Sequence, residues 1–205
     1  MGTRLIASLC ARGHAVRALV RPGSESKLPS GPTAIRGNAL DSSSYAEHVR
    51  GSDVLVHLVG VAHPSPAKAK QFPMIDLPSV EAAVAAAKAA GVAHFVYLSV
   101  AQPAPVMKDF ISVRARGENL IREAGLNATF LRPWYVLGPG HWWPVALMPL
   151  YWMWERIPST RDAARRLGLV TIGQMTAALV EAVEAPAPGI CVMEVPAIRR
   201  AREKP

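Results

Sequence analysis

Residues 86–100 read AAKAAGVAHFVYLSV and join the end of a helix to a strand. The alanine-rich run before Gly91 is made of strong helix formers, and a glycine directly after such a run is a C-terminal capping signal. The segment from His94 to Val100 is a continuous apolar run of strand length, which is typical of a strand covered on both faces. A helix, a short turn and a buried strand in succession are the unit from which parallel α/β sheets are built.

Helix and strand patterns alternate on both sides of this unit. The patterns predict helices over 3–12, 42–50, 78–90, 109–124 and 171–184, and strands over 15–20, 33–36, 53–60, 94–100, 128–131 and 190–195. Residues 33–36 are expected at a sheet edge, and residues 61–73 are expected to be loop because Pro64, Pro66 and Pro73 oppose a regular helix. We find no repeat or linker, so residues 1–205 are interpreted as one α/β domain that binds its ligand at the carboxyl ends of the strands.

Composition is ordinary for a globular protein, with half of the 205 residues hydrophobic, 19% charged and a formal net charge of +8. The basic residues are scattered along the chain. Their densest group is a tail that we expect to be solvated, formed by Arg199, Arg200, Arg202 and Lys204. This distribution argues against a nucleic-acid interface, whereas a basic surface suits a phosphorylated cofactor.

The two cysteines, Cys10 and Cys191, are far apart in apolar contexts and are interpreted as reduced thiols rather than as a disulfide or a metal site. The N-terminal stretch is broken by Arg4, Arg12 and His14, so it does not resemble a secretory signal. No run of the sequence reaches the ~18 apolar residues that a membrane span needs. We therefore expect a cytoplasmic protein without a metal ion.

Four phrases point to a known family. They are GTRLIASLCARGHAVRALVR (2–21), DVLVHLVG (53–60), AAKAAGVAHFVYLSV (86–100) and ATFLRPWYVLGPG (128–140). In this order they resemble the atypical and extended branches of the short-chain dehydrogenase/reductase superfamily, especially NmrA-like NAD(P)-binding proteins and relatives of the nucleoside-diphosphate-sugar epimerases. The resemblance implies a Rossmann-like, doubly wound parallel sheet that binds a nicotinamide dinucleotide.

The resemblance also implies an incomplete start. In the family, a strand and a GxxGxxG turn precede the first helix, and the last glycine of that turn matches Gly2. The first strand lies between the strands that match 15–20 and 53–60. We therefore expect an N-terminally truncated chain that lacks this strand and most of the turn. It is either a protein whose start codon was placed too far downstream or a shortened relative that no longer binds cofactor.

Arg21 bears on the choice of cofactor, because it directly follows the second strand of the family's order. An acidic residue there would bind the adenosine ribose, whereas an arginine can pair with a 2′-phosphate. Arg21, with Ser24 and Lys27 nearby, therefore favours NADP(H) over NAD(H), although it could also be an ordinary exposed arginine. The resemblance implies further cofactor contacts at Gly2, Asn38, Ala39, Gly60, Val61, Ser99, Arg114 and Pro133.

The family's catalytic tyrosine and lysine, spaced YxxxK, are replaced in the segment FISVRARGE by Phe110 and Arg114. Glu118 supports this alignment, because a glutamate four residues after the lysine recurs in relatives. Phenylalanine has no proton to give, and arginine stays charged, so standard acid–base chemistry is absent at these positions. Ser99 remains as a contact to cofactor or substrate or as a capping hydroxyl, and Ala101 stands at the family's catalytic hydroxyl.

Histidines could replace the missing proton donor. His63 and His141 lie in loops expected near the ligand and are the better candidates. His57 and Tyr97 lie inside predicted strands, where packing is the expected role.

Aromatic residues concentrate in the segment 134–168, which follows the strand over 128–131 and is interpreted as the substrate side. The segment contains Trp134, Tyr135, Trp142, Trp143, Tyr151, Trp152 and Trp154. Three interpretations stay open: a packed subdomain, a pocket for a flat or apolar substrate such as a quinone, and a surface that touches the membrane interface. The pocket interpretation assigns Trp134, Tyr135, His141 and Trp142 to the substrate.

Three functions fit the sequence. The first is an NAD(P)-dependent oxidoreductase or epimerase-like enzyme that acts on a small, apolar or quinone-like molecule. The second is a non-catalytic redox sensor or scaffold, and the third is a truncated protein that binds no cofactor. No oligomeric state is predicted.

Overall fold

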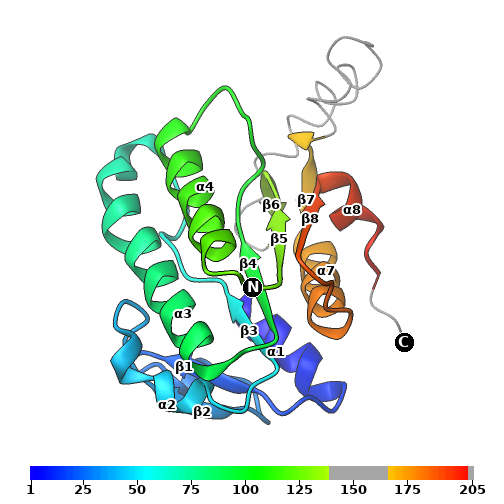
Figure 1. The fold of residues 1–205 in the computed structure, drawn as a ribbon. Helices are drawn as coiled ribbons and strands as arrows, with labels where there is room; N and C mark the ends of the chain where they lie inside the picture. The colour runs from blue at the N-terminus through cyan, green and yellow to red at the C-terminus, as the bar shows by residue number, and fades with distance from the viewer. Residues whose placement is uncertain (139–165, 203–205) are drawn as a thin grey trace.

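The computed structural model describes residues 1–138 and 166–202 (Figure 1). Its helices are α1 (Gly2–Ala11), α2 (Ala46–Val49), α3 (Leu77–Ala90), α4 (Lys108–Glu123), α7 (Ile172–Glu184) and α8 (Val195–Arg200). Its strands are β1 (Arg17–Val20), β2 (Thr33–Arg36), β3 (Val54–His57), β4 (His94–Leu98), β5 (Ala128–Arg132), β6 (Tyr135–Leu137), β7 (Leu169–Thr171) and β8 (Ile190–Glu194). Short helical turns are η1 (Glu25–Lys27), η2 (Ser42–Ser44), η3 (Pro66–Gln71) and the π-helical η4 (Phe72–Asp76).

The described strands pair in parallel throughout. The largest sheet has the order β3-β4-β5-β8, and two-stranded sheets join β1 to β2 and β6 to β7. In the largest sheet, His57 is in register with Tyr97, and Tyr97 is in register with Phe130. This parallel arrangement with intervening helices confirms the predicted α/β class.

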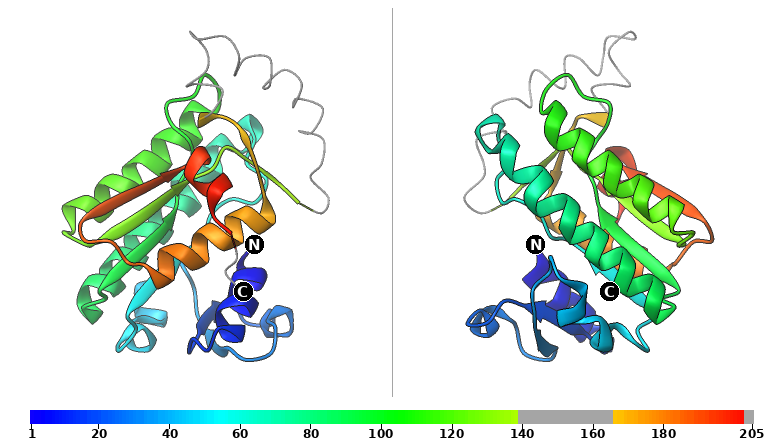
Figure 2. Two further views of the ribbon diagram at one scale, coloured as in Figure 1. Left: turned by 90° about the vertical axis from the view of Figure 1, so that its right-hand side faces the viewer. Right: turned by 60° about the vertical axis from the view of Figure 1, so that its left-hand side comes forward.

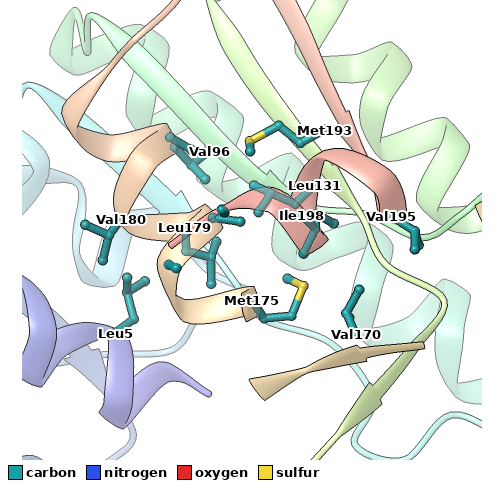
Figure 3. Close-up of a cluster of buried hydrophobic side chains, with 14 of the residues drawn as sticks. Leu5, Val96, Leu131, Val170, Met175, Leu179, Val180, Met193, Val195 and Ile198 are labelled. Atoms are coloured by element: carbon teal, nitrogen blue, oxygen red, sulfur yellow. The ribbon is translucent and has the colours of Figure 1, made fainter. Parts of the chain in front are cut away.

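Helices cover both faces of the largest sheet, as Figure 2 shows. On one face, α3 and α4 pack on Phe95, Tyr97 and Phe130. On the other face, α1, α7 and α8 pack on the alternate residues Val96 and Leu131. Figure 3 shows part of this second core, which contains Leu5 of α1 together with residues from α7, β7, β8 and α8. Alternate strand residues point to opposite faces, so a strand buried on both faces needs the continuous apolar run seen in β4.

Local signals explain where α3 ends and where α7 begins. Gly91 caps α3 with a φ of +66°, a conformation that an L side chain rarely adopts. At α7, Thr171 accepts a hydrogen bond from the backbone of Gln174 while the Gln174 side chain accepts one from Thr171, which is a complete capping box. The N-terminus of α7 is therefore encoded by four consecutive residues.

Several expected elements differ from those observed. The loop predicted over 61–73 contains η3 from Pro66, since a proline at the first helical position loses no hydrogen bond. The helix predicted over 42–50 is divided between η2 and the single-turn α2. Strands β6 and β7 and helix α8 were not predicted, because segments of three to six residues show too little periodicity.

Strands β1 and β3 belong to separate sheets. The first strand of the family would lie between them, and its existence stays a prediction. Residues Val54, Leu55 and Val56 of β3 are only half-buried, although their apolar run predicted a strand buried on both faces.

Candidate functional site

The carboxyl ends of β3, β4 and β5 meet at one edge of the largest sheet, because these strands are parallel. Three segments with predicted cofactor residues follow these ends: Gly60–Val61 after β3, Ser99 after β4 and Pro133 after β5. Helix α4 brings Phe110 and Arg114 to the same region, since Arg114 contacts both Leu98 of β4 and Asp76. The structure thus brings together the central part of the predicted site.

Arg114 is buried and takes part in an ion pair. Its Nη2 atom lies 2.7 Å from Oδ1 of Asp76, and its Nη1 atom donates a hydrogen bond of 2.9 Å to the carbonyl oxygen of Leu98. Burial raises the pKa of the Asp76 carboxyl, and the Arg114 guanidinium opposes this rise. The other carboxylate oxygen, Oδ2, accepts a hydrogen bond of 3.1 Å from the backbone N–H of Val61.

Phe110 stands in an aromatic setting rather than a polar one. It is half-buried, its ring lies 5.0 Å from that of Phe72, and the guanidinium carbon of Arg114 lies 5.2 Å from its centroid. Such a contact between a cation and a ring is favourable. Neither Phe110 nor Arg114 can transfer a proton near neutral pH, so this pair supplies no acid–base catalyst.

Ser99 belongs to a second buried network, centred on Glu118. The Ser99 hydroxyl donates a 2.6 Å hydrogen bond to Glu118, and Arg132 binds the same carboxylate through two hydrogen bonds of 2.8 and 2.6 Å. Gln102 and Arg122 complete the set at 3.0 and 3.1 Å. Burial alone would raise the pKa of Glu118, but the bonds from Arg132 and Ser99 lower it below its usual value. The hydroxyl proton of Ser99 is therefore used in the hydrogen bond to Glu118.

His57 and Tyr97 lie in the core beneath α3 and α4, as the sequence predicted for strand residues. Their ring centroids are 5.6 Å apart, and burial lowers the pKa of His57 to about 3, helped by the charge of Arg114. Tyr97 fits against α4 because residue 117 is glycine: a Cβ atom there would collide with the Tyr97 hydroxyl and lie 2.9 Å from its Cζ atom. His63 is exposed in the loop after β3, with a positive φ of 49°.

The residues predicted to hold the adenosine end lie on other loops. Arg21 is exposed directly after β1, and its carbonyl accepts a hydrogen bond from the Ser24 amide that closes a turn. Glu25, on the same loop, pairs at 2.5 Å with Arg36 at the end of β2. Asn38 follows β2, where its side chain accepts a hydrogen bond from the Leu40 amide, and half-buried Ala39 lies within that turn. Gly2, which the resemblance assigns to the glycine-rich turn and not to the adenosine, is the first residue of α1.

The remaining predicted residues lie after β5. Pro133 is buried, and its carbonyl accepts a hydrogen bond from the amide of Ala101. The half-buried rings of Trp134 and Tyr135 meet edge to face with centroids 5.6 Å apart. His141, Trp142 and the other aromatic residues between 139 and 165 lie outside the described residues.

Sequence reasoning did not assign Asp76 or Arg132 to the site. Asp76 directly precedes α3, and its side chain is fully buried. Arg132 is the last residue of an apolar strand and binds buried Glu118. A charged residue within or beside an otherwise apolar element is the signal that could have found both, since buried charges are almost always paired.

Comparison with protein families agrees with this arrangement. A family described as NAD(P)H-binding matches residues 1–138, which is most of the chain. The chain belongs to this NAD(P)H-binding family. The matched residues include α1, the loop after β3, the loop after β4, and Arg114 on α4. The match supports a nicotinamide dinucleotide as the ligand.

Individual relatives of this NAD(P)H-binding protein are more distant. The chain is 23% identical to a ceramide reductase of Caulobacter vibrioides over 98% of its length, and it spans 62% of the length of that relative. It is similar in fold to a Staphylococcus aureus nucleoside-diphosphate-sugar epimerase, with a TM-score of 0.67 and 19% identity over 94% of this chain and 66% of the epimerase. It is also similar in fold to a short-chain dehydrogenase/reductase superfamily protein of Agrobacterium tumefaciens with bound NAD, with a TM-score of 0.66 and 16% identity over 94% of this chain and 74% of that protein. These matches show a fold of the short-chain dehydrogenase/reductase and epimerase superfamily.

Two further properties of the NAD(P)H-binding protein concern its described part. Among residues 1–138 and 166–202, no cluster of three or more histidine, cysteine or acidic side chains is arranged to hold a metal ion. In the same residues, none of the helices combines the length and apolar character needed to span a bilayer.

Proposed function

We propose that this protein binds NADP(H) in preference to NAD(H) and passes hydride to an apolar acceptor without a tyrosine acid. The observation that carries the proposal is the pair Phe110 and Arg114. One is an aromatic residue packed on Phe72, and the other is a cation held by buried Asp76. A quinone-like acceptor can take hydride without a neighbouring tyrosine, whereas reduction of a ketone is aided by a proton donor.

The cofactor preference depends on Arg21. Its side chain is exposed at the end of β1, on a loop that the Glu25–Arg36 ion pair joins to the end of β2. An arginine offers several N–H donors to a phosphate, and it carries no lone pair that could accept hydrogen bonds from ribose hydroxyls. These properties support a 2′-phosphate as the group that this loop binds.

The apolar character of the acceptor rests on the surroundings of Phe110. Met74, on η4, is 70% exposed, and Val106, just before α4, is 53% exposed. Both belong to segments adjacent to α4, and Trp134 and Tyr135 follow β5 at the same edge of the sheet. The relative named ceramide reductase also takes its name from the reduction of a lipid. Exposed apolar side chains near a binding site favour an apolar ligand.

Binding is tested first, by titrating the chain with NADPH and NADH and following the nicotinamide fluorescence. Arg21→Asp should weaken NADPH binding by about ten- to a hundred-fold, since a charge-assisted contact contributes about 1.5–3 kcal/mol, and should change NADH binding much less. Arg50→Asp is the matched control, because it makes the same change of charge at an exposed arginine after α2. Equal losses for the two dinucleotides would remove Arg21 from the cofactor site.

Turnover is tested by following NADPH absorbance with a water-soluble quinone and, separately, with a long-chain ketone. The proposal expects NADPH oxidation with the quinone and much slower oxidation with the ketone. Fast reduction of the ketone would show that another side chain, such as His63, donates the proton.

A second function is favoured by the same two residues. A protein that binds NADP(H) and turns over neither acceptor would be a redox sensor or scaffold, as is thought of NmrA-like regulators. Both cysteines are free thiols, which fits the cytoplasmic location that we propose for either function.

A further inference from the structure

Three of the predicted cofactor positions meet at one buried carboxylate. Gly60 and Val61 lie in the exit loop of β3, Arg114 lies on α4, and the Asp76 side chain lies between them. We propose that Asp76 is a positioning residue that fixes the exit loop of β3 against α4 and so presets the dinucleotide site. This inference rests on the proposed function for its effect on binding but not for the contact itself.

The contact to the loop is made through the backbone. Oδ2 of Asp76 accepts the N–H of Val61 at 3.1 Å, across 15 residues of sequence. Val61 is half-buried, and the buried carboxylate of Asp76 gives its N–H a fixed partner, so this bond restrains the loop. The loop therefore depends on a side chain at the start of α3.

The contact to α4 is made through charge. Asp76 and Arg114 have side chains that are 0% and 6% exposed, so their attraction at 2.7 Å is weakly screened by solvent. Arg114 in turn donates to the carbonyl of Leu98, which ties α4 to the end of β4. Both terminal nitrogens of Arg114 are thus used inside the protein, one on Asp76 and one at the end of β4.

Gly60 shows how closely the loop approaches this pair. A Cβ atom on residue 60 would collide with Nη2 of Arg114 and lie 2.8 Å from Oδ1 of Asp76. The loop backbone therefore passes directly against the ion pair. A shift of the ion pair must move the loop that the family uses beside the cofactor.

Two variants of Asp76 separate its contacts. Asp76→Ala removes both, whereas Asp76→Asn keeps a side-chain oxygen for the Val61 amide and removes the charge that faces Arg114. The matched control is Thr129→Val, which removes the buried 2.9 Å hydrogen bond between His94 and Thr129 without touching the exit loop. Amide hydrogen exchange of Val61 in the absence of dinucleotide and the Kd for NADPH are the two measurements.

In Asp76→Ala we expect rapid exchange at Val61 and NADPH affinity lower by about ten-fold or more. In Asp76→Asn we expect slow exchange at Val61 and a smaller loss, about three-fold, because the loop keeps its bond while the charge on Arg114 is no longer balanced. Thr129→Val should lower the melting temperature and leave Val61 exchange and NADPH affinity unchanged.

Slow exchange at Val61 together with unchanged NADPH affinity in folded Asp76→Ala would overturn the inference. If Asp76→Ala does not fold, Asp76→Asn decides, and an NADPH affinity equal to that of the unaltered protein would overturn it. If the unaltered chain binds no dinucleotide, the proposed function fails, and Val61 exchange in the Asp76 variants still decides whether Asp76 holds the loop.

Discussion

Acid should destabilise this protein through one histidine in its core. His57 is 4% exposed between Phe95 and Tyr97, and within the described residues neither of its ring nitrogens has a hydrogen-bond partner. Burial and the nearby Arg114 charge lower its pKa from 6.5 to about 3. The folded protein therefore keeps the ring neutral at pH values where the unfolded chain protonates it.

The sign and size of the effect follow from linkage. Above pH 6.5 the ring is neutral in both states, and its contribution to stability does not depend on pH. Between pH 6.5 and the folded pKa of about 3, the unfolded state binds more protons than the folded state. The free energy of unfolding therefore falls by about 1.4 kcal/mol for each unit by which the pH is lowered. From pH 7 to pH 5 the loss from His57 alone is about 2 kcal/mol, which is a large part of a typical net stability of about 5–15 kcal/mol.

The test is urea denaturation at pH 7, 6 and 5 for the unaltered protein and for His57→Leu. Leucine fills a similar space and does not titrate, so the variant should lose about 2 kcal/mol less over this range. His94, whose pKa burial also lowers, contributes equally to both proteins and cancels in the comparison. Identical pH dependence in the two proteins would refute the reasoning.

Three further predictions concern the site and the helix caps. Phe110→Tyr with Arg114→Lys should raise ketone reduction by the chain in an NADPH assay, because it restores a titratable pair. The same activity in the double variant and the unaltered protein would contradict the alignment of these residues with the family's pair. Glu118→Gln should lower the free energy of unfolding by about 3 kcal/mol in urea titrations, since it removes the buried carboxylate that Arg132 binds at 2.6 Å and leaves only Glu194, at 3.8 Å, as its carboxylate neighbour. Thr171→Ala should cost about 1 kcal/mol in the same assay by removing the capping box of α7, and a change below the measurement error would show that the cap is dispensable.

The fold was predictable because its signals are local. The run from His94 to Leu98 is apolar throughout, and the adjoining helix is capped by Gly91, so strand and helix could be placed within one or two residues. Burial of β3 was overestimated, since hydrophobicity alone does not reveal how many neighbours a strand has.

The site was only partly predictable, because its decisive contacts join distant residues. The resemblance assigned Gly60, Val61 and Arg114 each to the cofactor, and the structure brings these residues together around Asp76. It did not reveal Asp76, which reaches Arg114 across 38 positions of sequence, as the residue numbers in the ion pair show. A pairing at such a separation depends on tertiary packing, which no local pattern encodes.

The fit between Tyr97 and Gly117 constrains how this sequence can vary. The hydroxyl of Tyr97 occupies the space that any side chain on residue 117 would need, so the two positions share one volume. A methyl group gained at position 117 has to be matched by atoms lost at position 97, because a close-packed core has no spare room for both. Position 117 should therefore accept a side chain only where residue 97 has become smaller, and a library that randomises position 117 alone should recover little besides glycine.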